Sequence, residues 1–252
     1  MLAIIQVGHN PASDLYIKNK VQDVSKAGLE ARVFNIPEEK ATTEGLIERV
    51  RHLSLTSEVS AIMVQLLLPE SIDEKKVMRA ISPDKDIDGL NPHSDYDPLT
   101  PCAIMRWIKN KYGSDYLQGK LVTILGRSDL VGKPLARLMI EAGATVVSCN
   151  SHTPNKIRRK MCSMSDVVVS AVGKIGVVDK KCVTYVIPAG LYIDVGINRD
   201  PVTNKMCGDI PNDVRNNIEA LGGCCPPVPG SVGKWTVNEL VLRLKEMEGI
   251  SE

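Results

Sequence analysis

Short apolar runs alternate with amphipathic stretches along the first part of the chain. The runs rich in β-branched and aliphatic residues are typical of buried strands and lie at LAIIQV (2–7), ARVFNI (31–36) and AIMVQLLL (61–68). Apolar positions recur at helical spacing in the stretches that follow these runs, near 13–27, 43–53 and 71–81. This repeated order of strand and helix predicts parallel strands joined by right-handed crossovers, with helices on both faces of the sheet.

The alternation restarts in the second half of the chain, after a helix predicted at 101–112. The strands predicted there are LVTIL (121–125), TVVSCN (145–150), DVVVSAVG (166–173) and LYIDVG (191–196). A helix over 132–143 separates the first two of these strands, and an amphipathic helix is predicted near the C-terminus from TVNELVLRLKEME (236–248).

Capping residues mark the predicted helix ends. Ser13 and Asp14 are N-cap candidates for the first helix, and Gly28 suits its C-cap. Thr100, followed by a proline, is placed to begin the helix that opens the second half. Thr236, with a glutamate three residues later, has the spacing of a capping box.

These elements predict an α/β protein with two domains. We expect an N-terminal α/β domain at 1–105, onto which a C-terminal helix at 235–252 packs back. A Rossmann-like nucleotide-binding domain follows at 106–234. Because open α/β sheets bind ligands at the carboxyl ends of their strands, we expect a ligand cleft between the two domains.

Composition and charge limit the classes of function. A chain of 252 residues with 43% hydrophobic residues can bury a proper core. Its 31 basic and 30 acidic residues are interspersed, so no basic face follows nucleic acid phosphates. No apolar run approaches the roughly 18 residues of a membrane span, and the N-terminus lacks the basic start of a signal peptide. We therefore expect a cytoplasmic protein with neither nucleic acid nor membrane as partner.

The cysteines and histidines give no sign of a metal site. The seven cysteines include no C-x-x-C spacing, which fits reduced thiols better than a disulfide framework. The four histidines are scattered singly along the chain, and a lone histidine is more often a surface or loop residue than a ligand. We predict no bound metal.

The segment LVTILGRSDLVGKPLARLM carries the signal for a nucleotide. It places Gly126 directly after a buried strand and Gly132 at the start of the next helix, which leaves backbone N–H groups free to face an anion. Since this is not the G-x-G-x-x-G fingerprint, a plain tight turn is an equal alternative on the segment alone. The following strand ends without the carboxylate that binds the ribose of NAD, whereas Arg127 and Ser151 could meet a 2′-phosphate. We therefore predict NADP, although a solvated loop arginine remains open for Arg127.

Polar residues in the first domain suggest a second site. Tyr16 and Lys20 lie four residues apart on one face of the first helix, and Gln65 interrupts an apolar run near a strand's carboxyl end. The loop SPDKDIDGLNP holds three aspartates, one of which could face the cleft while the others cap the turn. Each residue has an ordinary structural explanation when taken singly. At one cleft, however, a desolvated lysine could take part in proton transfer near neutral pH.

A Tyr-x-x-x-Lys pair beside a Rossmann unit also suggests the short-chain dehydrogenases. In those enzymes the pair follows the glycine-rich turn, whereas here it precedes that turn by a long stretch of chain. The order of the motifs therefore argues against that class.

Six segments in order resemble the bifunctional methylenetetrahydrofolate dehydrogenase/methenyltetrahydrofolate cyclohydrolases. They span almost the whole chain and are DLYIKNK, VQLLLP, DKDIDGLNP, GRSDLVGKP, DVGIN and PPVPGSVGKWT. The resemblance implies a homodimer of two-domain subunits that binds one-carbon derivatives of tetrahydrofolate. It also implies that NADP oxidises the methylene form and that the methenyl product is hydrolysed to 10-formyltetrahydrofolate.

The resemblance also implies a role for individual residues. Lys20 matches the family's catalytic lysine, Tyr16 its hydrogen-bonding tyrosine and Gln65 the glutamine that works with the lysine. The positions that match substrate-binding residues are Asp88, Tyr16, Pro229 and Gly230. Those that match cofactor-binding segments are Gly126, Arg127, Ser128, Ser151, Gly173 and Ile197.

Several positions depart from the family pattern. Leu67 stands where a proline is usual, and Ser231, Lys234 and Trp235 stand where small or apolar residues are usual. Asn150 and Ile175 replace a histidine and a proline that are common there. The connection HSDYDPL is shorter than in the family, and the helical segment that usually precedes the first strand has no counterpart. Either the chain is a fragment or divergent form, or the cleft wall is built differently.

Two alternatives stay open from the sequence. One is a folate- or nucleotide-binding relative that has lost one or both activities through these changes. The other is an unrelated two-domain dehydrogenase, such as a shikimate-type enzyme, which would not explain the order of the six motifs.

Overall fold

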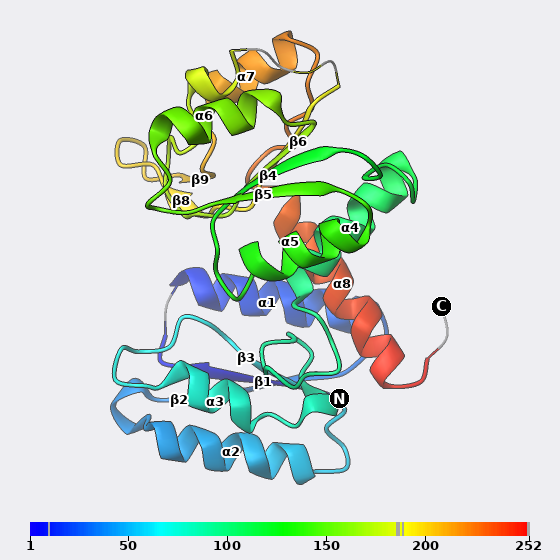
Figure 1. Ribbon diagram of the computed structural model, residues 1–252. Coiled ribbons are helices and arrows are strands. Elements are labelled where there is room, and N and C mark those ends of the chain that lie inside the picture. Colours follow the sequence, from blue (N-terminus) through cyan, green and yellow to red (C-terminus); the bar gives the residue numbers. More distant parts are fainter. Residues whose placement is uncertain (10, 185–186, 188, 251–252) are drawn as a thin grey trace. The chain divides into compact units, whose positions relative to one another are not determined.

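The chain forms two compact units in the computed structural model, which describes residues 1–9, 11–184, 187 and 189–250 (Figure 1). The units are Met1–Leu99 with Val237–Glu252, and Thr100–Thr236. The predicted domain boundary at residue 105 lies inside helix α4 (Leu99–Tyr112), and all but the first residue of this helix belongs to the second unit. Residues 251–252 of the predicted C-terminal helix lie outside the described residues.

The first unit contains a three-stranded parallel sheet with the order β2-β1-β3. Its strands are β1 (Leu2–Val7), β2 (Ala31–Ile36) and β3 (Ala61–Val64). In the central strand, Leu2 pairs with Ala31 on one side and with Ala61 on the other. Residues 2–5 of this strand are fully buried, which explains why its sequence is apolar without alternation.

Helices cover both faces of this sheet, as the sequence predicts (Figure 1). Side chains of α2 (Thr43–Leu55) and α3 (Glu74–Ala80) share a core with Ala3 and Ile5. Leu2 and Ile4 face the other way and share a core with side chains of α1 (Pro11–Lys26) and α8 (Val232–Met247). Alternate side chains of one strand thus build two cores. Two 3₁₀ helices, η1 (Glu38–Lys40) and η2 (Pro83–Lys85), lie in the connecting loops.

The predicted strand at 61–68 is too long. The backbone N–H of Gln65 donates the last ladder bond to the Ile5 carbonyl at 2.8 Å, and the chain then leaves the sheet. The apolar residues that follow are not core residues, since Leu67 is 88% exposed. The predicted helix at 71–81 is shorter in the structure, where Asp73 caps α3 by accepting from the Lys76 N–H at 3.1 Å.

The second unit contains a four-stranded parallel sheet with the order β5-β4-β6-β7. Its strands are β4 (Leu121–Leu125), β5 (Thr145–Cys149), β6 (Val167–Ser170) and β7 (Leu191–Asp194). A small antiparallel hairpin, β8 (Asn198–Arg199) with β9 (Met206–Cys207), follows the sheet. The strand order, with a crossover beside β4, is that of a Rossmann-like nucleotide-binding unit.

Two helical layers flank the second sheet (Figure 1). Residues of α4 and α5 (Gly132–Glu141) share a core with one face, and residues of α6 (Asn155–Met164) and α7 (Asn212–Ala220) share a core with the other. The 3₁₀ helix η3 (Lys180–Cys182) joins the second core. The sequence patterns missed α6 because its polar residues dominate and only Cys162 is buried.

Three of the capping predictions are wrong and one is confirmed. The first helix begins at Pro11 and α4 begins at Leu99, so neither Ser13 nor Thr100 is an N-cap. Thr236 lies inside α8 and donates to the Val232 carbonyl at 3.0 Å, because this helix starts earlier than its capping-box spacing suggests. Gly28 does end the first helix: it has a φ of 77° and donates to the Ser25 carbonyl at 3.0 Å.

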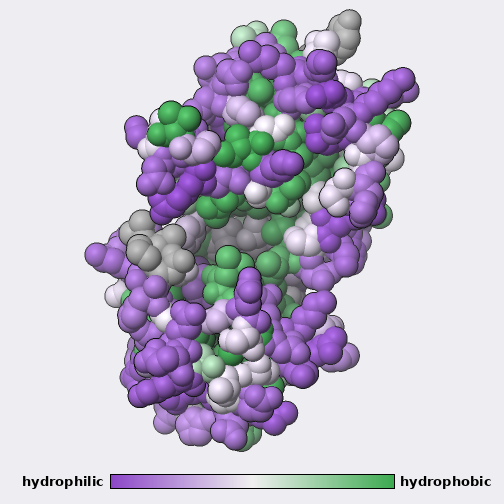
Figure 2. Space-filling model, turned by 90° about the vertical axis from the view of Figure 1, so that its left-hand side faces the viewer, coloured by the Kyte–Doolittle hydropathy of each residue, from purple (hydrophilic) through white to green (hydrophobic). Residues whose placement is uncertain are grey.

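The surface of each unit is largely hydrophilic in the view of Figure 2. Among the described residues, no helix is long and apolar enough to cross a membrane. The same residues contain no cluster of three or more histidine, cysteine or acidic side chains that could hold a metal ion.

The packing of α8 in the core of the first unit can be tested by substitution. Leu240 and Leu244 are fully buried against the first sheet. We expect Leu240→Ala to lower the free energy of unfolding by about 2–5 kcal/mol, because the truncation leaves a cavity that the core cannot close. Urea unfolding followed by circular dichroism measures this loss.

The matched control is Leu55→Ala, since Leu55 is 88% exposed. Its expected cost is within about 0.5 kcal/mol. Equal effects of the two substitutions would show that α8 is not part of this core.

Candidate active site

Lys20, Gln65 and Asp88 of the first unit lie together at the carboxyl end of β3, and Tyr16 lies one turn before Lys20 on its helix. Tyr16 and Lys20 come from α1, Gln65 follows β3 directly, and Asp88 follows η2. The Lys20 ammonium donates to Gln65 Oε1 at 3.1 Å and lies 3.3 Å from the Met63 Sδ atom. The structure thus brings the helix residue Lys20 and the strand-end residue Gln65 together.

The orientation of the Gln65 amide follows from its second contact. Its Nε2 donates to the Leu66 carbonyl at 2.7 Å, an oxygen that can only accept. The amide oxygen is thereby left to face Lys20, which can only donate while it is an ammonium. After Gln65 the chain passes through a cis peptide bond between Leu66 and Leu67.

Burial sets the electrostatics of this cluster. Removal of the Lys20 ammonium from water lowers the pKa of Lys20, and the nearby Asp88 carboxylate opposes that shift. Burial likewise raises the pKa of Asp88 to about 6, with Lys20 and Arg243 acting against the rise and Asp86 adding to it. Burial also raises the pKa of the Tyr16 hydroxyl. A buried base and a buried acid that both titrate closer to neutrality are typical of a catalytic site.

The loop around Asp88 shows why only one of its aspartates is available for chemistry. Asp86 is fully buried and accepts from the backbone N–H groups of Gly89 at 3.1 Å and Asn91 at 2.7 Å. Asp84 is exposed and accepts from the Ser82 hydroxyl. The expectation that one carboxylate faces the site while the others cap the turn agrees with these contacts.

Sequence reasoning missed Arg243. This residue of α8 is only 5% exposed, and its charge acts on Asp88. One signal could have found it: an arginine at position 243 falls beside Leu240 and Leu244 on the apolar stripe of its helix, where a charged residue needs a buried partner.

The turn between β4 and α5 in the second unit has no room for side chains at its glycines. Gly126 has a φ of 112°, and a Cβ atom there would lie 2.3 Å from the Ala171 carbonyl oxygen. A Cβ atom at Gly132 would lie 2.2 Å from the Gly126 oxygen. The Ser128 hydroxyl accepts from the Val131 N–H at 3.2 Å and so supports the start of α5. Helix, turn and strand therefore pack backbone to backbone, as a nucleotide-binding turn requires.

Arg127 and Ser151 lie beside the same strand end. The Arg127 side chain is exposed, and its Nε donates to the Ser148 hydroxyl at 3.2 Å while Nη2 donates to the Ser148 carbonyl. Ser151 is exposed in the turn that follows β5, where Asn150 Oδ1 accepts from the His152 N–H at 3.1 Å. No carboxylate follows β5, so the donors here fit a 2′-phosphate.

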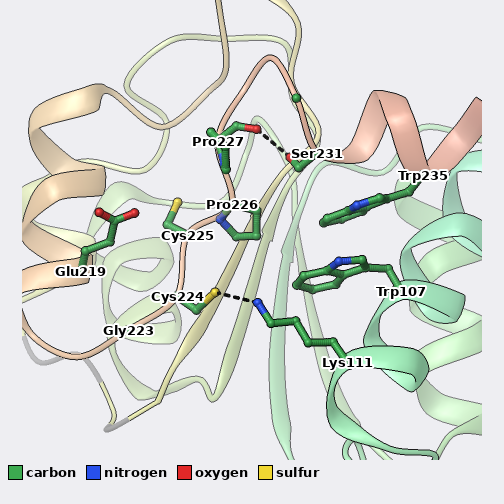
Figure 3. A pocket seen from close by; sticks show the side chains of 11 residues that line it. Trp107, Lys111, Glu219, Gly223, Cys224, Cys225, Pro226, Pro227, Ser231 and Trp235 are labelled. Atoms are coloured by element: carbon green, nitrogen blue, oxygen red, sulfur yellow. Dashed lines mark hydrogen bonds between the residues drawn. The ribbon is translucent and has the colours of Figure 1, made fainter.

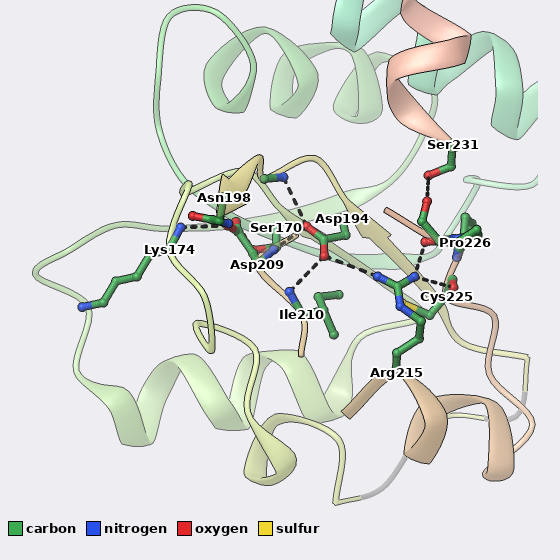
Figure 4. A network of polar contacts seen from close by, with 12 residues as sticks. Ser170, Lys174, Asp194, Asn198, Asp209, Ile210, Arg215, Cys225, Pro226 and Ser231 are labelled. Atoms are coloured by element: carbon green, nitrogen blue, oxygen red, sulfur yellow. Dashed lines mark hydrogen bonds and ion pairs between the residues drawn. The ribbon is translucent and has the colours of Figure 1, made fainter. Parts of the chain in front are cut away.

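Gly173 belongs to a turn that a buried carboxylate organises (Figure 4). The fully buried Asp209 accepts from the Val172 N–H at 2.9 Å, the Gly173 N–H at 3.3 Å and the Lys174 N–H at 2.8 Å. It also accepts from the Ser170 hydroxyl at 2.8 Å. Asp209 thus holds this turn together through its hydrogen bonds, although it belongs to none of the sequence motifs.

The DVGIN motif is explained by the same network. Asn198 donates to Asp209 Oδ1 at 3.0 Å, and a Cβ atom at Gly196 would lie 2.0 Å from that oxygen (Figure 4). Asp194 accepts from the Asp209 and Ile210 N–H groups, both at 2.9 Å. These residues hold the turn, whereas Ile197 between them is 55% exposed and available to a ligand.

Pro229 and Gly230 lie exposed in the second unit, in the segment before α8. Beside them, a pocket of about 490 Å³ is lined by Gly230, Ser231 and a pair of tryptophans (Figure 3). Trp235 stacks on Trp107 with ring centroids 4.1 Å apart. Ser231 donates to the Pro227 carbonyl at 2.7 Å. Ser231 and Trp235, two of the residues that depart from the family pattern, are thus packed within the second unit, whereas Lys234 between them is exposed.

Comparison with known proteins gives two family matches. Residues 1–88 match the model of the tetrahydrofolate dehydrogenase/cyclohydrolase catalytic domain, and residues 98–249 match that of the NAD(P)-binding domain of the same family. The bifunctional protein FolD of Rickettsia rickettsii is 40% identical over 248 residues, which are 94% of this chain and 81% of the relative.

Solved structures agree with these matches. The bifunctional enzyme FolD-methylenetetrahydrofolate dehydrogenase/cyclohydrolase from Campylobacter jejuni superposes with a TM-score of 0.87 at 29% identity, covering 98% of this chain and 87% of the other. A second solved structure is the methylenetetrahydrofolate dehydrogenase-cyclohydrolase from Trypanosoma brucei, in complex with NADP cofactor and inhibitor. It superposes with a TM-score of 0.85 at 29% identity, covering 98% of this chain and 85% of the other.

The close packing at the β4–α5 turn generates a prediction. We expect Gly126→Ala to cost roughly 3 kcal/mol or more, because the new methyl group meets a backbone oxygen and the positive φ is unfavourable. Gly119→Ala is the control: φ is also positive, at 69°, but no atom lies within 4 Å. Its expected cost is about 1 kcal/mol. Chemical denaturation of both variants checks the difference, and equal costs would contradict the close approach.

Proposed function

The chain belongs to the tetrahydrofolate dehydrogenase/cyclohydrolase family, and on that premise we propose that Lys20, Gln65, Asp88 and Tyr16 carry out its chemistry. The protein is an NADP-dependent enzyme that oxidises 5,10-methylenetetrahydrofolate to the methenyl form and hydrolyses this to 10-formyltetrahydrofolate. Matches to both domain models support this function over a binding protein that has lost its activities. The single observation that carries the site proposal is the partly buried Lys20 side chain, whose ammonium lies 3.1 Å from Gln65 Oε1 and near Asp88.

The second unit supplies the cofactor site in this proposal. The backbone of the β4–α5 turn and the hydroxyl of Ser128 face the phosphates, with Arg127 and Ser151 at the 2′-phosphate. Arg127 has five N–H donors, and its hydrogen bonds to Ser148 use only some of them. The other donors are left for phosphate oxygens. When bound, NADP accepts the hydride from the methylene carbon. The turns after three strands of the second sheet border this cofactor site, and they contain Gly126, Gly173 and Ile197.

The first unit holds the folate in this proposal. The Asp88 carboxylate binds N–H groups of the pterin, and Tyr16, one helical turn before Lys20, offers its hydroxyl on the same helix face. Pro229 and Gly230 provide further substrate contacts. The methenyl carbon is electrophilic because its positive charge is spread over two nitrogens.

Lys20 acts on water in the hydrolysis. Its lowered pKa increases the fraction of neutral amine, which accepts a proton as water adds to the methenyl carbon. The hydroxyl of the adduct then loses its proton as the bond from that carbon to N5 breaks, and N5 takes up a proton. The carbon–oxygen bond becomes the carbonyl of 10-formyltetrahydrofolate. Gln65 holds the lysine in place, since its amide oxygen is fixed toward the ammonium.

The family resemblance also leads us to propose a homodimer in the cytoplasm. One chain has a mass of 27.5 kDa, so light scattering on the purified protein should give twice that mass. A monomer would contradict the proposed assembly without affecting the assignment of Lys20.

Substitution of Lys20 tests the proposed roles. We expect Lys20→Met to reduce methenyltetrahydrofolate hydrolysis by roughly 100-fold or more, because the variant lacks the amine that takes the proton. Loss of methenyltetrahydrofolate absorbance without cofactor measures this step, and NADP affinity should stay within error of the parent. Lys18→Met is the control, since Lys18 is exposed on the same helix. A Lys20 variant that still hydrolyses would remove this residue from the mechanism.

Substitution of Arg127 tests the cofactor preference. We expect Arg127→Ala to weaken the binding of NADP by roughly 10- to 100-fold and the binding of NAD by far less, because only NADP carries the 2′-phosphate. Titration of each nucleotide by calorimetry measures both affinities. Arg137→Ala controls for charge, since Arg137 is 48% exposed in an ion pair with Glu141. Equal weakening of both nucleotides would refute the 2′-phosphate contact.

A further inference from the structure

Arg243 holds both ends of the loop that carries Asp88. A single guanidinium nitrogen, Nη1, donates to the Ile87 carbonyl at 2.8 Å and to the Asp97 carbonyl at 2.7 Å. Ile87 directly precedes Asp88, and Asp97 lies at the far end of the same loop. A residue near the C-terminus thus joins two points of the backbone on either side of the substrate-binding carboxylate.

The loop is compact enough for such a clamp. Gly89 has a φ of 66°, and a Cβ atom there would lie 2.5 Å from the Asp97 carbonyl carbon and oxygen. The Leu99 N–H donates to the Asp88 carbonyl at 3.3 Å. The ring of Tyr96 lies 5.2 Å from the Arg243 guanidinium carbon, which adds a cation–π contact. The loop is also the shortened connection that the sequence comparison with the family singled out.

The buried charge of Arg243 lies near two carboxylates, those of Asp88 and Glu239. Its Nη2 lies 4.0 Å from Glu239 Oε1 on the preceding turn of α8, at the limit of an ion pair. Both side chains are about 5% exposed. Burial of a guanidinium has a large desolvation cost, and a neutral donor could bind the two carbonyls without that cost. The positive charge of Arg243 should therefore have a function besides hydrogen bonding to the loop.

We infer that Arg243 is a positioning residue for the folate reaction: it clamps the loop that presents Asp88 and supplies a positive charge that keeps this carboxylate ionised. The inference rests on the proposed role of Asp88 in substrate binding. Arginine suits both tasks, because it remains charged at all relevant pH values and offers several donors in one plane.

The charged groups that face Asp88 set the direction of the effect. Lys20 from α1 and Arg243 from α8 favour its ionised form, whereas Asp86 on the same loop disfavours it. The pKa of Asp88 is already raised to about 6 by burial. Loss of the Arg243 charge raises this pKa further, so that the carboxylate binds a proton at a higher pH and substrate binding weakens from the acid side.

The experiment compares Arg243→Met, Arg243→Lys and the control Lys245→Met in the full chain. KM for methylenetetrahydrofolate and kcat are measured from pH 5.5 to 9, together with NADP affinity. We expect Arg243→Met to raise KM by roughly tenfold near pH 6.5, with a smaller change in kcat and unchanged NADP affinity. The acid limb of kcat/KM should move up by roughly half a pH unit or more.

Arg243→Lys separates charge from shape. It keeps the positive charge but cannot span both carbonyls with the same geometry, so the acid limb should return close to that of the parent while KM stays partly raised. This variant also keeps the test decisive if Arg243→Met fails to fold. Lys245→Met should behave like the parent throughout.

Two outcomes overturn the inference. A parent-like pH profile in Arg243→Met, with only a lower melting temperature, would make the residue purely structural. A KM raised equally at every pH, with no rescue by lysine, would remove the electrostatic role. Absence of both activities in the parent chain would instead refute the proposed function, and with it this inference.

Discussion

A lysine ammonium that has been taken out of water is the constraint on which the first unit depends. Burial destabilises the charged form of Lys20, and its partners restore only part of what water provided. Gln65 offers one amide oxygen, and Asp88 offers a carboxylate that is itself desolvated. The position of Asp88 depends in turn on a loop closed by Asp86 and Arg243. Helix, strand end, loop and C-terminal helix are therefore parts of one electrostatic arrangement.

The constraint in the second unit is different, because there two stretches of backbone must approach each other closely. Gly126 and Gly132 let the strand, turn and helix of the nucleotide site come nearer than any side chain would allow. Around the next turn, the N–H groups that point inward would be unsatisfied without the carboxylate of Asp209. Here a buried acid has a structural task, whereas the role that we propose for Asp88 in the first unit is to bind the substrate.

Much of the fold could be predicted because its signals are local. The apolar runs of β1 and β2 coincide with the predicted strands, since a central parallel strand must be apolar on both faces. The predictions failed where an apolar run continued beyond the sheet, as at Leu67, or where a surface helix such as α6 buries a single residue. In the site, helical spacing identified Tyr16 and Lys20, and a polar residue in an apolar run identified Gln65.

The sequence by itself determined the two α/β units, the strands of each sheet, and the residue types that donate, accept or bind anions. The pattern of the loop left open which of its three aspartates faces Lys20, although the family resemblance implied Asp88. Only the tertiary structure places Asp88 near Lys20 and brings Arg243 from the far end of the chain to close their loop. The physical reason is that periodicity and turn chemistry arise between near neighbours in the chain, whereas desolvation of a charge depends on whatever distant segments pack around it.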